Sequence, residues 1–342
     1  MKRTEISSLG QFGLIDRLTE DFKSTKHAST ILGCGDDAAV IDSGNPEAYT
    51  LLTTDLLLEG IDFDLTYFPL KHLGYKAVIR GISDIVAMNG TARQITFSIG
   101  VSARFCVENL DELYEGIQRA CKDYELDLVG GDTSASLTGL TISITAVGEV
   151  KKNRLVRRSG AKPNDLICLT GDLGSAYMGL QLLEREKRVF KGNDNPQPQF
   201  AGHEYILRRQ LSPEARIDVI ESLEKADIVP TSMIDISDGL ASEVLQICKS
   251  SACGARIYLD KLPIARETNE MADELNADQV VAALNGGEDF ELLFTVPLEK
   301  KEEISRVGGI DVIGYITAPE QGALLVTPDG SEIALKAQGF KS

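Results

Sequence analysis

The amino-acid sequence predicts an α/β fold with mixed sheets (α+β), arranged as two domains. With 342 residues, the chain is long for a single hydrophobic core and matches two domains of ordinary size. Short apolar runs of strand length alternate with longer segments whose apolar residues recur at helical spacing. A turn-rich segment at 160–165 interrupts this series. We therefore expect an N-terminal domain over residues 1–150 and a C-terminal domain over residues 151–342.

The N-terminal half contains the elements of one α/β domain. Leu73, Val78 and Ile82 occupy one face of a helix that ends near Asn89-Gly90, a favourable stop. Segments that alternate between apolar and polar residues predict strands. In chain order we expect a helix at 9–22, strands at 38–41 and 49–52, a helix at 71–89, a strand at 95–101, a helix at 109–124, and strands at 126–129 and 141–150.

The C-terminal half repeats this mixture of elements. We expect a strand at 166–170, helices at 175–189, 214–225 and 239–250, and a strand at 292–296 that Pro297 ends. The polar segment 191–203 contains two prolines and is expected to be a surface loop. The sequence leaves open whether this loop closes over a site.

The charge balance excludes some partners. A formal net charge of −17 argues against the backbone of a nucleic acid and against an anionic membrane as partners. Phosphorylated substrates remain compatible if cations neutralise part of an acidic cleft. No run approaches the ~20 apolar residues that span a bilayer, and no apolar leader follows the N-terminus. The six scattered cysteines suit small buried thiols in a reducing compartment, so we expect a cytoplasmic protein.

Acidic residues beside glycines or hydroxyls are the main chemical signal in the chain. Several of these motifs close an apolar run, as strand ends would, so their carboxylates are expected to converge on one cleft. Packed carboxylates repel one another and recruit protons or hard cations, which points to magnesium with a phosphorylated substrate. The motifs are Gly33-Cys34-Gly35-Asp36-Asp37, Thr53-Thr54-Asp55, Ile82-Ser83-Asp84, Gly130-Gly131-Asp132-Thr133, Asp235-Ile236-Ser237-Asp238-Gly239 and Gly286-Gly287-Glu288-Asp289.

Each motif also has a purely structural interpretation. The segment 33–37 can be a simple turn, and one of its two aspartates is expected to face the cleft while the other caps or meets solvent. The segment 53–55 can be a helix N-cap. A cap explains only one of the aspartates in 235–239, and Asp84 interrupts a buried-looking helix face. The joint occurrence of these motifs therefore favours a shared cation site.

Several familiar chemistries are missing from the sequence. There is no Gly-x-x-x-x-Gly-Lys-Ser/Thr loop, no catalytic loop of protein kinases and no Gly-x-Ser-x-Gly motif. The three histidines lie in polar settings typical of surface residues. The basic residues Lys76, Arg80, Arg157, Arg158 and Lys162 accompany the acidic motifs, but spacing alone does not single out Arg158.

The ordered set of motifs resembles the thiamine-monophosphate kinase family, over a region that runs from about residue 10 to the C-terminus. The resemblance includes the acidic motifs above and the segment Arg-Ser-Gly-Ala-Lys-Pro at 158–163. The wider superfamily includes aminoimidazole ribonucleotide synthetase, selenophosphate synthetase and a hydrogenase maturation factor. Selenophosphate synthetase is disfavoured because no Cys-Gly pair of the reactive kind occurs near the N-terminus.

The resemblance implies ATP-dependent phosphorylation of thiamine monophosphate to thiamine diphosphate, by direct in-line transfer with several magnesium ions. It implies a catalytic role for Asp132, Asp238 and Arg158. The implied metal ligands are Asp37, Thr53, Thr54, Asp55, Asp84, Asp132, Asp235 and Asp238. The implied ATP contacts are Gly131, Asp132, Arg158 and Ser237, and the implied thiamine contacts are Asp62, Glu288 and Phe340. Asp62 and Phe340 depart from relatives that carry histidine and tryptophan at these places.

The resemblance also implies a two-domain fold like that of aminoimidazole ribonucleotide synthetase. Its N-terminal sheet would pair with that of a second subunit, giving a homodimer. Two alternatives stay open: an ATP-dependent enzyme of the same superfamily with a different acceptor, and a non-catalytic metal-binding scaffold. The number of metal ions and any requirement for a monovalent cation are also open.

Overall fold

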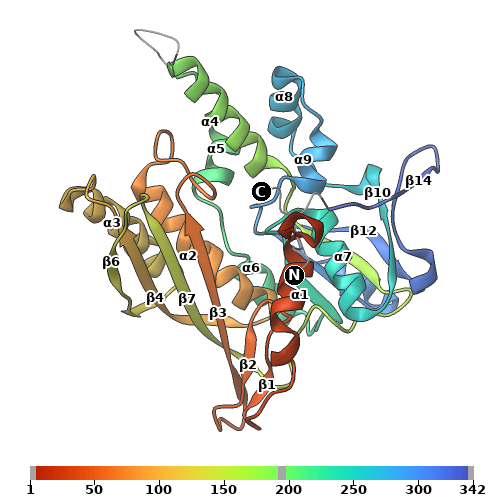
Figure 1. Cartoon of the computed structure of the whole chain (residues 1–342). Helices are drawn as coiled ribbons and strands as arrows, with labels where there is room; N and C mark the ends of the chain where they lie inside the picture. The colour runs from red at the N-terminus through yellow and green to blue at the C-terminus, as the bar shows by residue number, and fades with distance from the viewer. Residues whose placement is uncertain (1–4, 192–197, 338–342) are drawn as a thin grey trace.

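The computed structural model describes residues 5–191 and 198–337 (Figure 1). Two seven-stranded sheets organise this part of the chain. The two sheets and their helices confirm the mixed α/β fold expected from the sequence. None of the described helices is long and apolar enough to cross a membrane.

The N-terminal sheet has the strand order β1-β2-β3-β7-β4-β5, and β6 also pairs with β4. Its ladders are antiparallel except for β4–β5 and β4–β6, which are parallel. The elements are α1 (Gly10–Thr19), β1 (Thr30–Leu32), β2 (Ala39–Ile41), β3 (Ala48–Leu58), α2 (Leu70–Ala87), β4 (Thr91–Val101), α3 (Val107–Asp123), β5 (Asp127–Gly130), β6 (Thr133–Ala135) and β7 (Thr141–Lys151).

Helix α2 covers one face of this sheet and runs behind β3 and β7 in Figure 1. Two glycines allow α2 and α3 to pack in close contact. A Cβ atom on Gly74 would lie 2.0 Å from the carbonyl oxygen of Leu113, and one on Gly116 would lie 1.9 Å from that of Lys71. No side chain fits at either position without separating the two helices.

The opposite face of the N-terminal sheet carries exposed apolar side chains. Strand alternation turns Leu51 and Leu57 toward the helices and Leu52 and Leu56 away from them. Leu52 is 37% exposed and Leu56 is 53% exposed. This open face, which we define by Leu52, Leu56 and Leu58 of β3, is an apolar surface of the kind that commonly marks an interaction site.

The C-terminal sheet has the strand order β14-β13-β10-β12-β8-β11-β9. Its strands are β8 (Leu166–Thr170), β9 (Ser232–Asp235), β10 (Gly254–Tyr258), β11 (Leu292–Val296), β12 (Ile310–Thr317), β13 (Ala323–Val326) and β14 (Glu332–Ala334). Its helices are α4 (Ser175–Lys191), α5 (Glu204–Leu211), α6 (Ile217–Lys225), α7 (Leu240–Ser251), α8 (Arg266–Leu275), α9 (Gln279–Asn285) and α10 (Lys301–Ile304).

One hydrophobic core joins the two sheets. It begins between α2 and the N-terminal sheet and continues, through Leu223 of α6, to one face of β8, β9 and β11, where it includes Phe294. A second core fills the other face of the C-terminal sheet beneath α7, with Val244 and Ile247. A smaller third core lies among α4, α5, α8 and α9. The two halves of the chain therefore share buried apolar surface.

The differences from the expected elements are informative. Strand β3 continues to Leu58 because all eleven of its residues pair with β7, so Thr53, Thr54 and Asp55 lie inside a strand and not after one. Helix α6 begins at Ile217, three residues later than expected. The predictions missed β1, β6, β9, β10, β12, β13 and β14, and helices α5, α8, α9 and α10. Residues 192–197 of the expected loop lie outside the described residues.

Candidate active site

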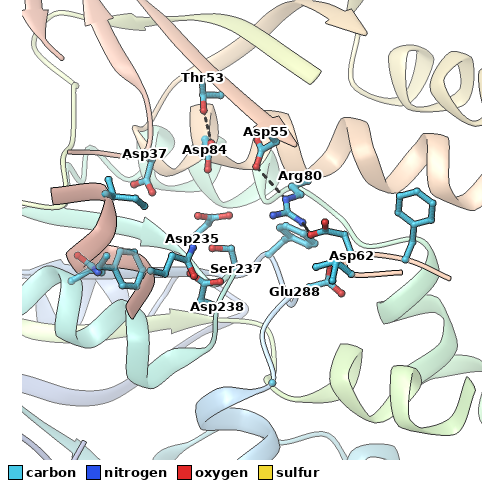
Figure 2. A pocket seen from close by; sticks show the side chains of 18 of the residues that line it. Asp37, Thr53, Asp55, Asp62, Arg80, Asp84, Asp235, Ser237, Asp238 and Glu288 are labelled. Atoms are coloured by element: carbon cyan, nitrogen blue, oxygen red, sulfur yellow. Dashed lines mark hydrogen bonds and ion pairs between the residues drawn. The ribbon is translucent and has the colours of Figure 1, made fainter. Parts of the chain in front are cut away.

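A cavity of about 870 Å³ opens between the two halves of the chain. It receives side chains from the loop before β2, from β3, α2 and α7, and from the segment that leads into β11. Helix α1 borders it through Phe12 and Ile15. The side chains around the cavity form an acidic end and an end with paired charges, as Figure 2 shows.

Three aspartates meet at the acidic end. Asp37 comes from the loop before β2, Asp84 from α2, and Asp235 from the last position of β9. One carboxylate oxygen from each lies within 4.8 Å of the others, and Figure 2 shows the three side chains turned toward one another. Asp37 Oδ2 and the neighbouring Asp55 Oδ2 are buried without a hydrogen-bond partner. Buried carboxylate oxygens that lack partners are suited to a hard cation.

Burial and mutual repulsion raise the pKa of these carboxyls. Burial, followed by the charge of Asp37, raises the pKa of Asp235 to about 7. The pKa of Asp84 lies well above its ordinary value because of burial and then the charges of Asp55, Asp235 and Asp37. Burial also raises the pKa of Asp55. The cluster therefore holds protons near neutral pH unless a cation replaces them.

Hydroxyl groups orient two of the three aspartates. Thr53 Oγ1 donates to Asp84 Oδ2 over 2.6 Å, and Ser83 Oγ donates to Asp235 Oδ2 over 2.6 Å. The Thr54 hydroxyl instead donates to the carbonyl of Ile144 over 3.0 Å. Since successive residues of a strand face opposite sides, Thr53 and Asp55 share the cavity side of β3 and the Thr54 side chain does not.

Arg158 joins the acidic loop to the C-terminal half. Its Nε and Nη2 donate to Asp37 Oδ1 over 3.1 and 2.5 Å. Its backbone N–H donates to Asp36 Oδ1 over 3.1 Å. The two adjacent aspartates thus have different roles. The Asp37 carboxylate faces the cluster, and the Asp36 carboxylate accepts a hydrogen bond from the backbone of Arg158.

The other end of the cavity pairs acids with bases. Arg80 donates from Nε to Asp55 over 3.1 Å and from Nη1 to Asp62 over 3.0 Å. Lys76 donates to Glu288 over 2.9 Å. Burial opposes ionisation of Glu288, but the charge and hydrogen bond of Lys76 hold its pKa below the ordinary value. Glu288 therefore remains ionised beside the cavity.

Ser237 and Asp238 lie in the turn that precedes α7 and line the same cavity. The backbone N–H of Asp238 donates to Glu243 Oε1 over 2.9 Å. Burial and then the charge of Asp238 raise the pKa of Glu243 well above its ordinary value. Glu243 thus supports the turn from within α7.

Two residues of the expected set lie elsewhere. Gly131 and Asp132 are exposed between β5 and β6 and do not line the cavity. Asp132 accepts the backbone N–H of Ile99 through its carbonyl, and its side chain accepts that of Thr133. Three strand spacings separate β5 from β3 in the sheet, a distance of roughly 14 Å. Phe340 lies outside the described residues.

Sequence reasoning did not assign Lys76, Arg80 or Glu243 to the site. A signal existed for the first two, because positions 76, 80 and 84 are four apart and share one face of α2. Asp84 was already a candidate, so its helix neighbours toward the N-terminus were detectable. Glu243 has no comparable signal, since its role depends on the turn before α7.

Comparisons with known proteins show which family models and relatives the chain matches. Residues 35–150 match the family model of AIR synthase related protein, N-terminal domain, and residues 162–327 match that of the C-terminal domain. The chain is 32% identical to the thiamine-monophosphate kinase of Bacillus subtilis over 339 residues, covering 97% of the chain and 99% of that protein. It is 33% identical to that of Escherichia coli strain K12, covering 97% of each.

Solved structures of known proteins are also similar to this chain. The structure described as AaThiL complexed with AMPPCP and TMP has a TM-score of 0.83 and 30% identity, and the match covers both chains completely. Hydrogenase maturation protein HypE in complex with ATP has a TM-score of 0.67 and 19% identity, covering 95% of this chain and 94% of HypE. The latter likeness concerns the fold alone.

Proposed function

The chain belongs to the thiamine-monophosphate kinase family within the AIR synthase related proteins, and we infer that it uses ATP to phosphorylate thiamine monophosphate to thiamine diphosphate. The observation that carries this conclusion is the complete match, at 30% identity, to a structure holding AMPPCP and TMP. The cavity between the two halves of the chain supplies the acidic cluster that such a reaction requires.

We propose that the acidic end binds magnesium. Asp37, Asp84 and Asp235 would hold it, with Asp55 and Thr53 beside them. The fit rests on the unpartnered oxygens of Asp37 and Asp55 and on a donor set made only of oxygen. The bound ions would neutralise phosphate charge and align the reacting oxygens.

Other side chains of the cavity would bind the two substrates. We assign Arg158, Ser237 and Asp238 to the nucleotide side and Asp62 and Glu288 to the thiamine side, where carboxylates attract a cationic ring. The acceptor phosphate oxygen is already ionised near neutral pH, since its second pKa is ~6. The reaction therefore needs no strong general base, and direct in-line transfer depends mainly on alignment.

We further propose a cytoplasmic homodimer in which the open face of the N-terminal sheet is the contact. The exposed leucines of that face favour burial against a second copy. Asp132 lies away from the cavity of its own protomer, so a catalytic role requires that it reach the cavity of the partner. A dimer through the open face would provide that route because β5 and β6 belong to the same sheet.

An assay of ADP release with and without thiamine monophosphate tests the function. The purified chain should release ADP only when magnesium and thiamine monophosphate are both present. Asp235→Asn should be inactive in the same assay, and Asp227→Asn, which changes a fully exposed carboxylate, should retain normal turnover.

The same assay separates the alternatives. ADP release without the acceptor, or with another acceptor only, would instead indicate a relative with a different substrate. Silence under all conditions, with ATP and magnesium bound, would indicate a scaffold.

A further inference from the structure

The segment 286–291 has an unusual backbone at the thiamine end of the cavity. Glu288 and Phe290 are not glycines, yet their φ angles are +58° and +52°. L-residues adopt this left-handed region rarely, and such strain persists only where the surrounding structure enforces it. Glu288 and Phe290 both line the cavity.

Asp289, which lies between Glu288 and Phe290, and Glu291, which follows them, face a buried ionic network. Asp289 accepts the backbone N–H of Gly174 over 2.9 Å and lies 4.0 Å from Arg209. Glu291 lies 2.9 Å from Arg209 Nη1 and pairs through its other oxygen with Arg216. The side chains of Asp289 and Glu291 are almost completely buried.

Further contacts fix the backbone of the segment. The N–H of Glu288 donates to the carbonyl of Ser237 over 2.8 Å, and that of Phe290 donates to the carbonyl of Ile236 over 2.9 Å. Thr170 donates to Glu291 Oε2 over 2.5 Å. Gly171 leaves room for the Glu291 carboxylate, since a Cβ atom there would lie 2.1 Å from Oε1.

We propose that Asp289 and Glu291, held by Arg209 and Arg216, are positioning residues that set Glu288 and Phe290 for recognition of the acceptor. The chain alternates between the two sides of the segment. Glu288 and Phe290 line the cavity, while Asp289 and Glu291 anchor the intervening backbone on the buried side. Apolar residues can often replace a buried ion network without loss of stability, so stability alone does not explain this one. Because the network lies directly behind a strained binding segment, its role is to align that segment.

This inference rests on the proposed function, because it assigns the acceptor to the end of the cavity where Glu288 lies. It makes a specific kinetic prediction. Asp289→Asn keeps an acceptor oxygen but removes the charge that faces Arg209, so Glu288 should shift from its place. The KM for thiamine monophosphate should rise by about ten- to a hundredfold, the loss typical of a small misplacement. The KM for ATP should rise by a smaller factor, since the segment meets the nucleotide side through the backbone carbonyl of Ser237 and leaves Arg158 paired with Asp37.

A double-mutant cycle separates positioning from a general loss of stability. Glu288→Gln, Asp289→Asn and the double variant are compared for the KM of the acceptor. If Asp289 acts through Glu288 and Phe290, the loss in the double variant should be clearly smaller than the two single losses combined. Leu325→Ala, a core truncation in β13 away from the cavity, controls for lost stability and should leave both KM values unchanged. Additive losses, or equal increases in both KM values, would overturn the proposal.

A crystal structure of Asp289→Asn provides a readout that does not depend on activity. Residues 288 and 290 should leave the left-handed region, and retention of both angles would refute the positioning role. If the wild-type chain turns over no acceptor while the variant structure shows the relaxed segment, the proposed function fails and the positioning role of Asp289 stands.

Discussion

Replacing Asp235 with asparagine should stabilise the metal-free protein while abolishing its response to magnesium. Asp235 is 2% exposed, and its pKa is raised from 3.8 to about 7. A shift of one pKa unit corresponds to about 1.36 kcal/mol, so keeping this carboxyl ionised in the folded state costs up to about 4 kcal/mol above pH 7. The amide of the variant would remove the charge and keep an oxygen that can accept the hydrogen bond of Ser83.

The pH dependence of this effect has a definite sign. The folded state binds the Asp235 proton more tightly than the unfolded state, so the stability of the wild type falls as pH rises from about 4 to about 7. Below pH 4 both states are protonated, and the two proteins should differ little. At pH 8, with chelator present, the variant should be the more stable one.

Chemical denaturation at pH 4.5 and pH 8, with chelator or with magnesium, measures these differences. A ligand at a hundredfold its Kd adds about 2.7 kcal/mol to the wild type, whereas Asp235→Asn should gain almost nothing. Asp227→Asn is the matched control and should follow the wild type. A variant that is less stable in chelator at pH 8, and that magnesium stabilises as much as the wild type, would refute the cation site.

Three further variants test the other parts of the site. Mixing inactive Asp132→Asn with inactive Asp235→Asn should restore about a quarter of the wild-type activity if each cavity uses Asp132 of the partner subunit, and no recovery would refute this sharing. Leu56→Asp should convert a dimer into monomers in light scattering, and an unchanged mass would exclude the open face as the contact. Lys76→Met should cost about 1–3 kcal/mol near neutral pH because Glu288 loses its partner, and denaturation should show the loss fading at acidic pH, as the pH falls through the lowered pKa of Glu288 and its carboxylate takes up a proton. A loss that persists there would point to packing.

The sequence predicted the long elements well because their patterns are local. Helices α2 and α3 carry apolar stripes over seventeen or more residues, which leaves little ambiguity. Short buried strands such as β9 and β10 resemble pieces of a helix, and only pairing with distant segments defines them. The end of β3 was misplaced because Thr53-Thr54-Asp55 looks like a terminus, whereas pairing with β7 continues through these residues.

The convergence of acidic side chains was predictable from the sequence, and the full set of residues around the cavity was less so. Acidic residues beside glycines and hydroxyls pointed to one cation site, and the fold brings Asp37, Asp84 and Asp235 together from remote segments. The position of Thr54 followed from strand alternation alone, once the strand was known to continue. The place of Asp132 depends on the order of the strands, which no local pattern encodes.

The continuous core between the two sheets limits how the enzyme can move. A chain cut near residue 150 would expose the apolar side chains that bridge its halves, so neither half should fold alone, and denaturation should proceed as one transition. Wide hinge opening would uncover the same surface. Substrates must therefore enter a groove whose walls stay fixed, and adjustments during turnover must come from its borders, such as helix α1.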